Sequence, residues 1–117
     1  MATSYQWPFK DPDETLDYSI DWSRFLGTAT IANVVWAVKS TNYATETIIA
    51  SGQDLTTASG GAETDNIQNS AQTETDTVAT INVAGGVANR EYTFYCTMTD
   101  STGSVAKRSV KLKVRER

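Results

Sequence analysis

The chain has 117 residues, a formal net charge of −4 and no histidine. This length suits one domain with a single core, and the lack of histidine removes the usual general base, the commonest zinc ligand and every histidine-activated nucleophile. Cys96 is the only cysteine, so no internal disulfide can form and the fold must depend on packing.

Neither a membrane span nor a secretion signal is visible in the sequence. The longest apolar runs, such as Val34–Val38, are only a few residues long, whereas a membrane-spanning helix needs about 20. Residues 1–8 have neither the basic start nor the apolar stretch of a secretion signal. We therefore expect no membrane contact and a protein that is made and kept in a cytoplasm, or released only by lysis.

Charge is distributed unevenly along the chain. Residues 87–117 carry seven basic and three acidic side chains, a balance of +4, which leaves −8 on residues 1–86. Either the fold brings the acidic and the basic regions of one chain together, or the uneven charge is used to stack one copy of the chain against another. The sequence leaves both alternatives open.

Residues 1–14 are predicted to form an extended arm. Pro8 and Pro12 push the residues before them toward extended geometry and remove backbone donors. Trp7 and Phe9 lie in this arm without supporting periodicity. Their rings either tuck back onto the domain or insert into a partner.

The first strand is predicted at residues 15–23, and Gly27 marks the turn after it. Its core face is expected to consist of Leu16, Tyr18, Ile20 and Trp22, which alternate with Asp17, Ser19, Asp21 and Ser23. A second strand is predicted over residues 30–39, with Trp36 at the centre of the core and its indole N–H in need of a partner.

The middle of the chain gives a weaker signal. Residues 46–50 and 53–57 suit short strands on either side of Ser51-Gly52, and residues 59–76 suit a loop with a strand near Ile67. Strand assignment between residues 40 and 76 stays open.

Regular alternation returns in the last third. A strand is predicted at residues 77–83 and ends at Gly85-Gly86, before a hairpin that turns at residues 100–103. The buried face of its first strand is expected to be Tyr92, Phe94, Cys96 and Met98, and that of its second Val110, Leu112 and Val114. Because strands follow one another without a helical period, the sequence predicts an all-β sandwich over residues 15–117.

The hairpin resembles the closing strands of bacterial and phage immunoglobulin-like domains. The matching positions are Gly86, Tyr92, Asp100 and Gly103. The resemblance implies an immunoglobulin-like sandwich in which the tyrosine hydroxyl closes a corner by donating to the backbone. Cys96 has no partner cysteine, so the likeness to antibody domains stops at topology.

Catalytic and metal-binding chemistry finds little support. Asp17 and Asp21 share a strand face but lie about 13 Å apart, too far for a glycosidase pair. Asp11, Asp13 and Glu14 are oxygen ligands of the kind that calcium prefers, yet no calcium loop accompanies them, and whether the arm binds calcium stays open. We predict no enzyme activity, cofactor or metal site, and a buried, inert Cys96 thiol.

Lys111, Lys113 and Arg115 form a basic stripe near the C-terminus. Binding to nucleic acid is disfavoured because the whole chain is acidic and no aromatic residues are interleaved with the stripe. The stripe either protects an edge strand or meets Asp17 and Asp21 of the first strand. The second alternative has the first and last strands side by side, or adjacent subunits joined in a ring.

Residues 10–27 resemble the opening of a family of small bacteriophage virion proteins, the fiber-tail adaptors. Trp36, the Gly85-Gly86 turn, Tyr92 and the basic residues 111–117 support this resemblance, whereas residues 40–76 do not align. The resemblance implies a structural protein of the virion tail or neck that links it to fibers in several symmetric copies, after synthesis in the host cytoplasm. Strand edges and the arm are the surfaces expected to bind tail, neck and fiber proteins. The expected interface residues are Trp7, Phe9, Lys10, Asp11, Asp13, Asp17, Asp21, Lys111, Lys113 and Arg115.

Two other non-enzymatic functions compete with this one. A free-standing immunoglobulin-like module would bind a glycan or receptor through a cleft lined with aromatic residues, and a capsid decoration protein would coat the head instead of the tail. The sequence leaves copy number and position in the virion open.

Overall fold

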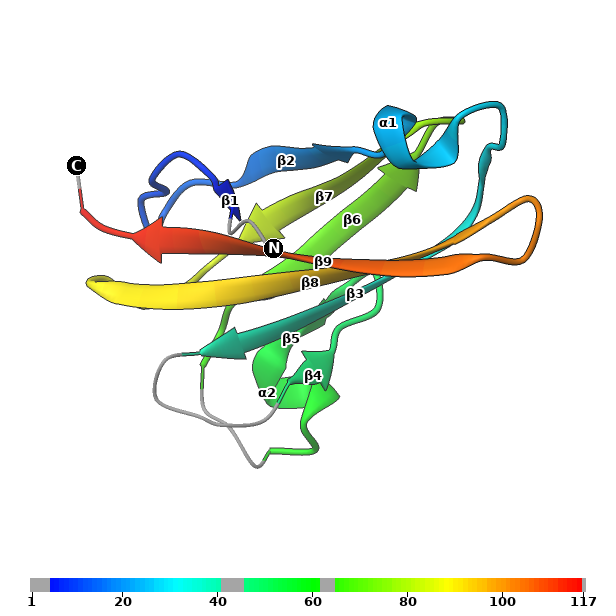
Figure 1. Cartoon of the computed structure of the whole chain (residues 1–117). Helices are drawn as coiled ribbons and strands as arrows, with labels where there is room; N and C mark the ends of the chain where they lie inside the picture. The colour runs from blue at the N-terminus through cyan, green and yellow to red at the C-terminus, as the bar shows by residue number, and fades with distance from the viewer. Residues whose placement is uncertain (1–4, 41–45, 62–64, 117) are drawn as a thin grey trace.

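Nine strands and two four-residue helices make up the regular structure of residues 5–40, 46–61 and 65–116, the part of the chain that the computed structural model describes. The strands form two sheets packed face to face (Figure 1). The first sheet has the order β1-β9-β8-β3-β4, with bounds β1 Tyr5–Gln6, β9 Val105–Val114, β8 Arg90–Asp100, β3 Ile31–Ser40 and β4 Thr47–Ile48. The second has the order β2-β7-β6-β5, with bounds β2 Leu16–Asp21, β7 Val78–Ala84, β6 Gln68–Glu74 and β5 Gln53–Asp54. The all-β prediction is confirmed.

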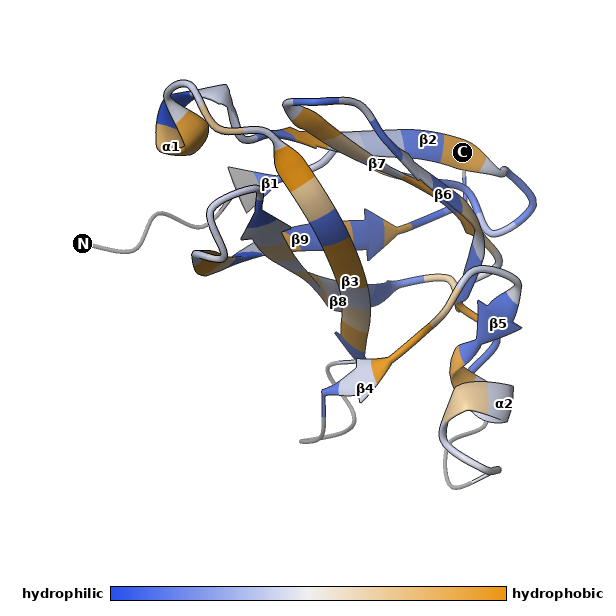
Figure 2. Cartoon of the chain, turned by 90° about the vertical axis from the view of Figure 1, so that its right-hand side faces the viewer, coloured by the Kyte–Doolittle hydropathy of each residue, from blue (hydrophilic) through white to orange (hydrophobic). Residues whose placement is uncertain are grey.

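Alternation along the strands fills the core. In β7 and β8 alternate residues are buried, as expected for strands with one face against another sheet. Apolar residues mark β3 in Figure 2. The buried core includes Tyr18, Ile20, Trp22, Trp36, Ile81, Tyr92, Phe94, Cys96, Met98, Val110, Leu112 and Val114, and Leu16 is partly buried against it.

Most of the predicted strands form within one or two residues of their expected bounds. β2 is followed at once by the helix α1 (Ser23–Leu26), which ends at Gly27 with φ +60°. The hairpin turn also forms, because Asp100 Oδ1 accepts the backbone N–H groups of Thr102 and Ser104. β9 begins at Val105, five residues before the alternation that predicted it.

The middle of the chain differs from the prediction in two places. β6 takes up seven residues of the segment expected to be a loop, and it begins directly after Ile67, near which a strand was expected. The strand expected at residues 53–57 stops after Asp54 and becomes the helix α2 (Leu55–Ala58). The Asp54 carboxylate accepts the Thr57 N–H at 2.7 Å while the Thr57 hydroxyl accepts the Asp54 N–H, and this reciprocal cap starts a helical turn. Residues 41–45 and 62–64 lie outside the described residues.

Residues 5–14 run along the side of the sandwich where each sheet has an edge. β1 pairs in parallel with β9 at Val110 and Lys111, and Lys10 forms a further parallel bridge with Val114. The remaining neighbours within both sheets pair antiparallel. β2 is the outermost strand of the second sheet, so the arm lies between the two sheet edges.

Candidate functional site

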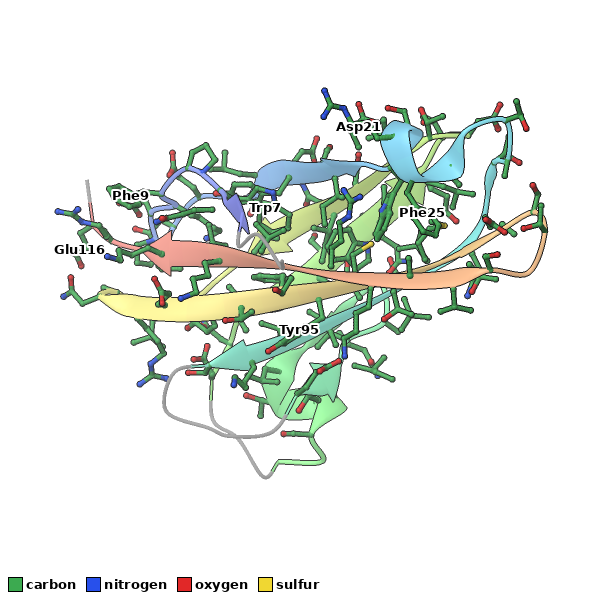
Figure 3. All side chains as sticks on the ribbon, viewed as in Figure 1. Trp7, Phe9, Asp21, Phe25, Tyr95 and Glu116 are labelled. Carbon is green, nitrogen blue, oxygen red and sulfur yellow. The ribbon has the colours of Figure 1, made fainter. Side chains whose placement is uncertain are left out.

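Trp7 inserts between the two sheet edges (Figure 3). Its ring stacks on Tyr18 with centroids 4.7 Å apart and also contacts Trp36 and Phe94. The indole N–H donates to the backbone carbonyl of Ser19, on the outer edge of β2, at 3.4 Å. Of the two alternatives left by the sequence, the Trp7 ring tucks back onto the domain.

Lys10 holds the arm to two other parts of the chain. Its side chain is fully buried, and its ammonium donates to the carbonyl oxygens of Asp11 at 2.9 Å and Gly85 at 2.6 Å. Its backbone N–H donates to Lys113 O, and its carbonyl accepts the Arg115 N–H. Burial lowers the pKa of Lys10, and the nearby carboxylates of Glu14 and Asp11 oppose that shift. The lysine therefore joins the arm, the turn after β7 and the end of β9.

Phe9, next to Lys10 in the arm, is partly exposed to solvent. Its side chain is 39% exposed, the Arg115 guanidinium lies 4.8 Å from the ring centroid and the Lys113 ammonium 6.0 Å away. Pro8, Phe9, Arg115 and Glu116 line an open hollow of about 510 Å³. Figure 3 shows Phe9 and Glu116 at the same end of the molecule. This end of the sandwich combines an accessible aromatic ring with two cations.

The acidic residues of the arm bind their own backbone. Asp11 Oδ1 accepts the Asp13 N–H at 2.9 Å, and Glu14 Oε1 accepts the Asp11 N–H at 2.8 Å. These two bonds stabilise the turn that brings the chain into β2. Among the described residues no cluster of three or more metal-ligating side chains is found.

The predicted pairing of the first acidic strand with the basic stripe does not form within one chain. β2 and β9 belong to different sheets. Asp17 instead accepts from the Asn82 side-chain amide at 2.7 Å, and Lys111 lies 3.9 Å from Glu91. The strand beside β9 is β1, because the arm crosses to that edge before the chain enters β2.

A second hollow, of about 250 Å³, lies at the open side of the sandwich. It is lined by Gln6, Trp7, Ser19, Ile20, Asp21, Arg108 and Val110. The Arg108 guanidinium lies 4.5 Å from the centroid of the Trp22 ring. The Ser23 backbone N–H lowers the pKa of Asp21, with smaller contributions from Arg108 and Arg24. Trp7 is the one aromatic side chain among the residues that line this hollow, so an aromatic-lined cleft is not formed there.

Tyr92 closes a corner of the fold in a different way from that implied by the resemblance. Its hydroxyl accepts the Val87 N–H at 2.8 Å and donates to the buried carboxylate of Asp65. Asp65 also binds Arg90 at 2.8 Å and the Ile67 N–H at 3.0 Å. Burial and the Asp65 hydrogen bond raise the pKa of Tyr92. No sequence pattern pointed to Asp65, which lies in the segment expected to be a loop.

The Cys96 thiol and the Trp36 indole both lie in the core. Cys96 is fully buried, as predicted, and burial raises the pKa of its thiol to about 12. The Trp36 indole N–H is buried without a hydrogen-bond partner in the described structure, contrary to the expectation that it would find one. No helix in the described part of the chain is long and apolar enough to cross a membrane.

The predicted interface residues divide into buried and accessible groups. Trp7 and Lys10 are buried. Asp11 and Lys113 are half-exposed. The other six are exposed, namely Phe9, Asp13, Asp17, Asp21, Lys111 and Arg115. Whether any of them contacts another protein stays a prediction.

Comparison with known proteins places the chain in a family. No curated protein matches it. The family model described as podophage GP4 fiber-tail adaptor protein gp77 matches residues 10–75, more than half of the chain. The match begins at Lys10 and includes residues 40–75, which the sequence resemblance did not align, but it does not reach Tyr92 or the basic C-terminus. The chain thus belongs to the podophage fiber-tail adaptor family typified by gp77.

Proposed function

We propose that this chain is a non-enzymatic structural protein of a phage virion, which links the tail or neck to fibers as one of several symmetric copies. The family match over residues 10–75 carries the proposal. The lack of histidine and the inert environment of Cys96 agree with a role in binding, since neither offers a nucleophile–base pair.

The two-sheet fold is proposed to be an immunoglobulin-like sandwich, with residues 1–14 as its arm and residues 15–117 as its body. In the variable-type immunoglobulin topology one sheet contains strands G, F, C and C′, and the facing sheet contains strands B, E and D. The order β9-β8-β3-β4 corresponds to G-F-C-C′, and the order β2-β7-β6 corresponds to B-E-D. The Tyr92 hydroxyl binds the backbone at Val87, which is similar to the corner of such domains, but it does so as an acceptor and not as a donor.

Partner binding is proposed for the accessible members of the predicted interface. Phe9 and Arg115 offer an aromatic ring and a planar cation at one end of the sandwich, and such residues are enriched where protein interfaces are strongest. Trp7 and Lys10 contribute by holding the arm in place, because their side chains are buried.

Co-sedimentation of the purified chain with tail and fiber proteins tests the function. The expected result is a stable complex with both, weakened at least tenfold by Phe9→Ala together with Arg115→Glu. Ser101→Ala together with Arg24→Glu is the matched control, since these residues lie at the other end of the sandwich, at the β8–β9 turn and in α1. A chain that binds glycans alone and neither virion protein would overturn the proposal.

A further inference from the structure

Charge is segregated between the two sheets. The strands of the second sheet contain four acidic residues and no basic one, namely Asp17, Asp21, Asp54 and Glu74. The strands of the first sheet contain six basic residues, Lys39, Arg90, Lys107, Arg108, Lys111 and Lys113, against the two acids Glu91 and Asp100. The uneven charge along the sequence therefore becomes an uneven charge between the two sheets, whose inner faces pack together and whose outer faces point in opposite directions (Figure 1).

Asp17 and Asp21 lie on the outer face of the second sheet, whereas Glu74 pairs with the buried Ala79 and so shares its inner side. Alternation in β2 buries Tyr18 and Ile20 and leaves Asp17 and Asp21 exposed. The Asp17 carboxylate is held there by the Asn82 amide, and the neighbouring row is neutral, with Ser19 and Thr80 joined at 2.8 Å. No cation of the described residues forms an ion pair with this face.

Four lysines, Lys39, Lys107, Lys111 and Lys113, lie on the outer face of the first sheet, whereas Arg90 and Arg108 point inward, to Asp65 and to the Trp22 ring. Lys39, Thr93 and Lys111 form one row across three strands. Lys107 binds Glu46 and Lys111 approaches Glu91, but both lysine side chains are 48% exposed. Pairs as exposed as these contribute little and exchange partners readily. Ile48 and Val105, 62% and 63% exposed, add apolar contact area to this sheet.

The spacing of the charges matches between the faces. Residues four apart on a strand are separated by about 13 Å, and this is the separation of both Asp17 from Asp21 and Lys107 from Lys111. Strand β2 of one molecule laid over β9 of another brings both pairs of opposite charges together. Because the two faces point in opposite directions, a single chain cannot satisfy them, but a second copy can.

We propose that the acidic outer face of the β2-β7-β6-β5 sheet binds the basic outer face of the β1-β9-β8-β3-β4 sheet of a second copy. Such a contact joins different surfaces on the two molecules, so its repetition generates a ring if the rotation closes and a filament if it does not. The inference deepens the multi-copy part of the proposed function and rests on it for its biological setting.

Sedimentation velocity of the purified full chain, at low and high salt, tests the contact. The wild type is expected to associate with increasing concentration at low salt and to dissociate at high salt, because opposite charges hold the faces together. Asp17→Lys and Lys111→Glu are each expected to raise the dissociation constant about tenfold. Glu116→Lys changes the net charge by the same amount as Asp17→Lys, but away from both faces, and is expected to leave the dissociation constant unchanged.

Mixing the two charge-reversed variants is the decisive part of the experiment. An equimolar mixture of the Asp17→Lys and Lys111→Glu proteins is expected to recover wild-type association, since each variant then meets a complementary face. Melting temperatures near that of the wild type would show that the variants fold. A chain that stays monomeric at every concentration, or reversals that act like the control, would overturn the contact. Co-sedimentation with tail and fiber proteins keeps the two proposals separable, because a monomeric chain that still binds both leaves the adaptor function standing.

Discussion

Trp7 stacks on Tyr18 with the two ring planes 20° from parallel, and this contact joins the N-terminal arm to the first strand of the second sheet. Nearby, the Tyr18 hydroxyl donates to the Pro8 carbonyl at 3.2 Å. The arm therefore closes the open side of the sandwich between β9 and β2. Anything that binds the arm is positioned by this closure.

Removing the Trp7 ring should loosen the arm. Trp7→Ala is expected to lower the free energy of unfolding by up to about 3 kcal/mol, since a buried aromatic ring is lost but the arm can detach while the sandwich stays folded. Urea denaturation measures the change. Phe9→Ala is the control and should cost less than about 1 kcal/mol, because the Phe9 ring is partly in solvent. Equal losses for the two variants would contradict the structure.

The Lys10 ammonium is expected to be needed to hold the N-terminal arm against β9 and the turn after β7. Lys10→Met keeps most of the buried chain but leaves the carbonyls of Asp11 and Gly85 without their donor, which should cost about 1 to 3 kcal/mol. Hydrogen exchange at the backbone N–H groups of Lys10 and Arg115 should accelerate, because these groups form the bridge between the arm and β9. Lys113→Met is the control, because Lys113 is half-exposed and lies at the end of β9, close to the bridge between Lys10 and Val114. Unchanged exchange in Lys10→Met would show that the ammonium does not hold the arm.

Gly85 is expected to tolerate no side chain. Its φ is +73°, and a Cβ there would lie 2.3 Å from the Asn66 carbonyl oxygen. Gly85→Ala should therefore destabilise the fold by about 2 kcal/mol or more, through strain and a backbone clash together. Gly103→Ala isolates the strain, since Gly103 has φ +90° with open space around it, and should cost about 1 kcal/mol. A Gly103 variant as damaged as the Gly85 variant would exclude the clash.

Asp65 and Tyr92 should be energetically coupled. A double-mutant cycle of Asp65→Asn and Tyr92→Phe is expected to give a coupling energy of about 1 to 3 kcal/mol, because both Asp65 oxygens accept from the buried hydroxyl. A coupling near zero, measured by urea denaturation, would mean that the hydrogen bond contributes nothing to stability.

The same hydroxyl predicts a dependence on alkaline pH. The pKa of Tyr92 is raised above its ordinary value of 10.0 by burial, so between pH 10 and the folded pKa the native state binds more protons than the unfolded state. The contribution of Tyr92 to stability is thus complete below about pH 10 and is lost as the pH rises further. The stability difference between the wild type and Tyr92→Phe should stay constant up to about pH 9 and shrink as the pH rises above about 10. A constant difference would contradict the shift.

The sequence predicted the strands whose buried faces are apolar, but it indicated no more than a strand near Ile67 where β6, whose buried face is polar, forms. In β6 the inward Asn69 donates to the Ile49 carbonyl and Gln72 donates to the Val34 carbonyl. Amides that bond to distant backbone groups give no hydrophobic alternation, and a bulge between Asn69 and Ala71 interrupts the period. Such a strand is visible only once its partners are in place.

The candidate site could be predicted in composition but not in arrangement. The sequence identified the arm, the acidic β2 and the basic β9, but one of the alternatives that it left open had the first and last strands side by side, and this arrangement does not form. Periodicity reveals which residues share a face of a strand and says nothing about which sheet the strand joins. The two residues of β1, too short for any period, take the position beside β9 that was expected of β2.

Locating the chain in the intact particle by electron cryo-microscopy tests the adaptor function most directly. Density for this two-sheet fold is expected in several symmetric copies between the tail and the base of each fiber, with residues 5–14 or an outer sheet face against a neighbouring protein. Density over the capsid surface, or a particle that lacks the chain and still carries its fibers, would contradict it.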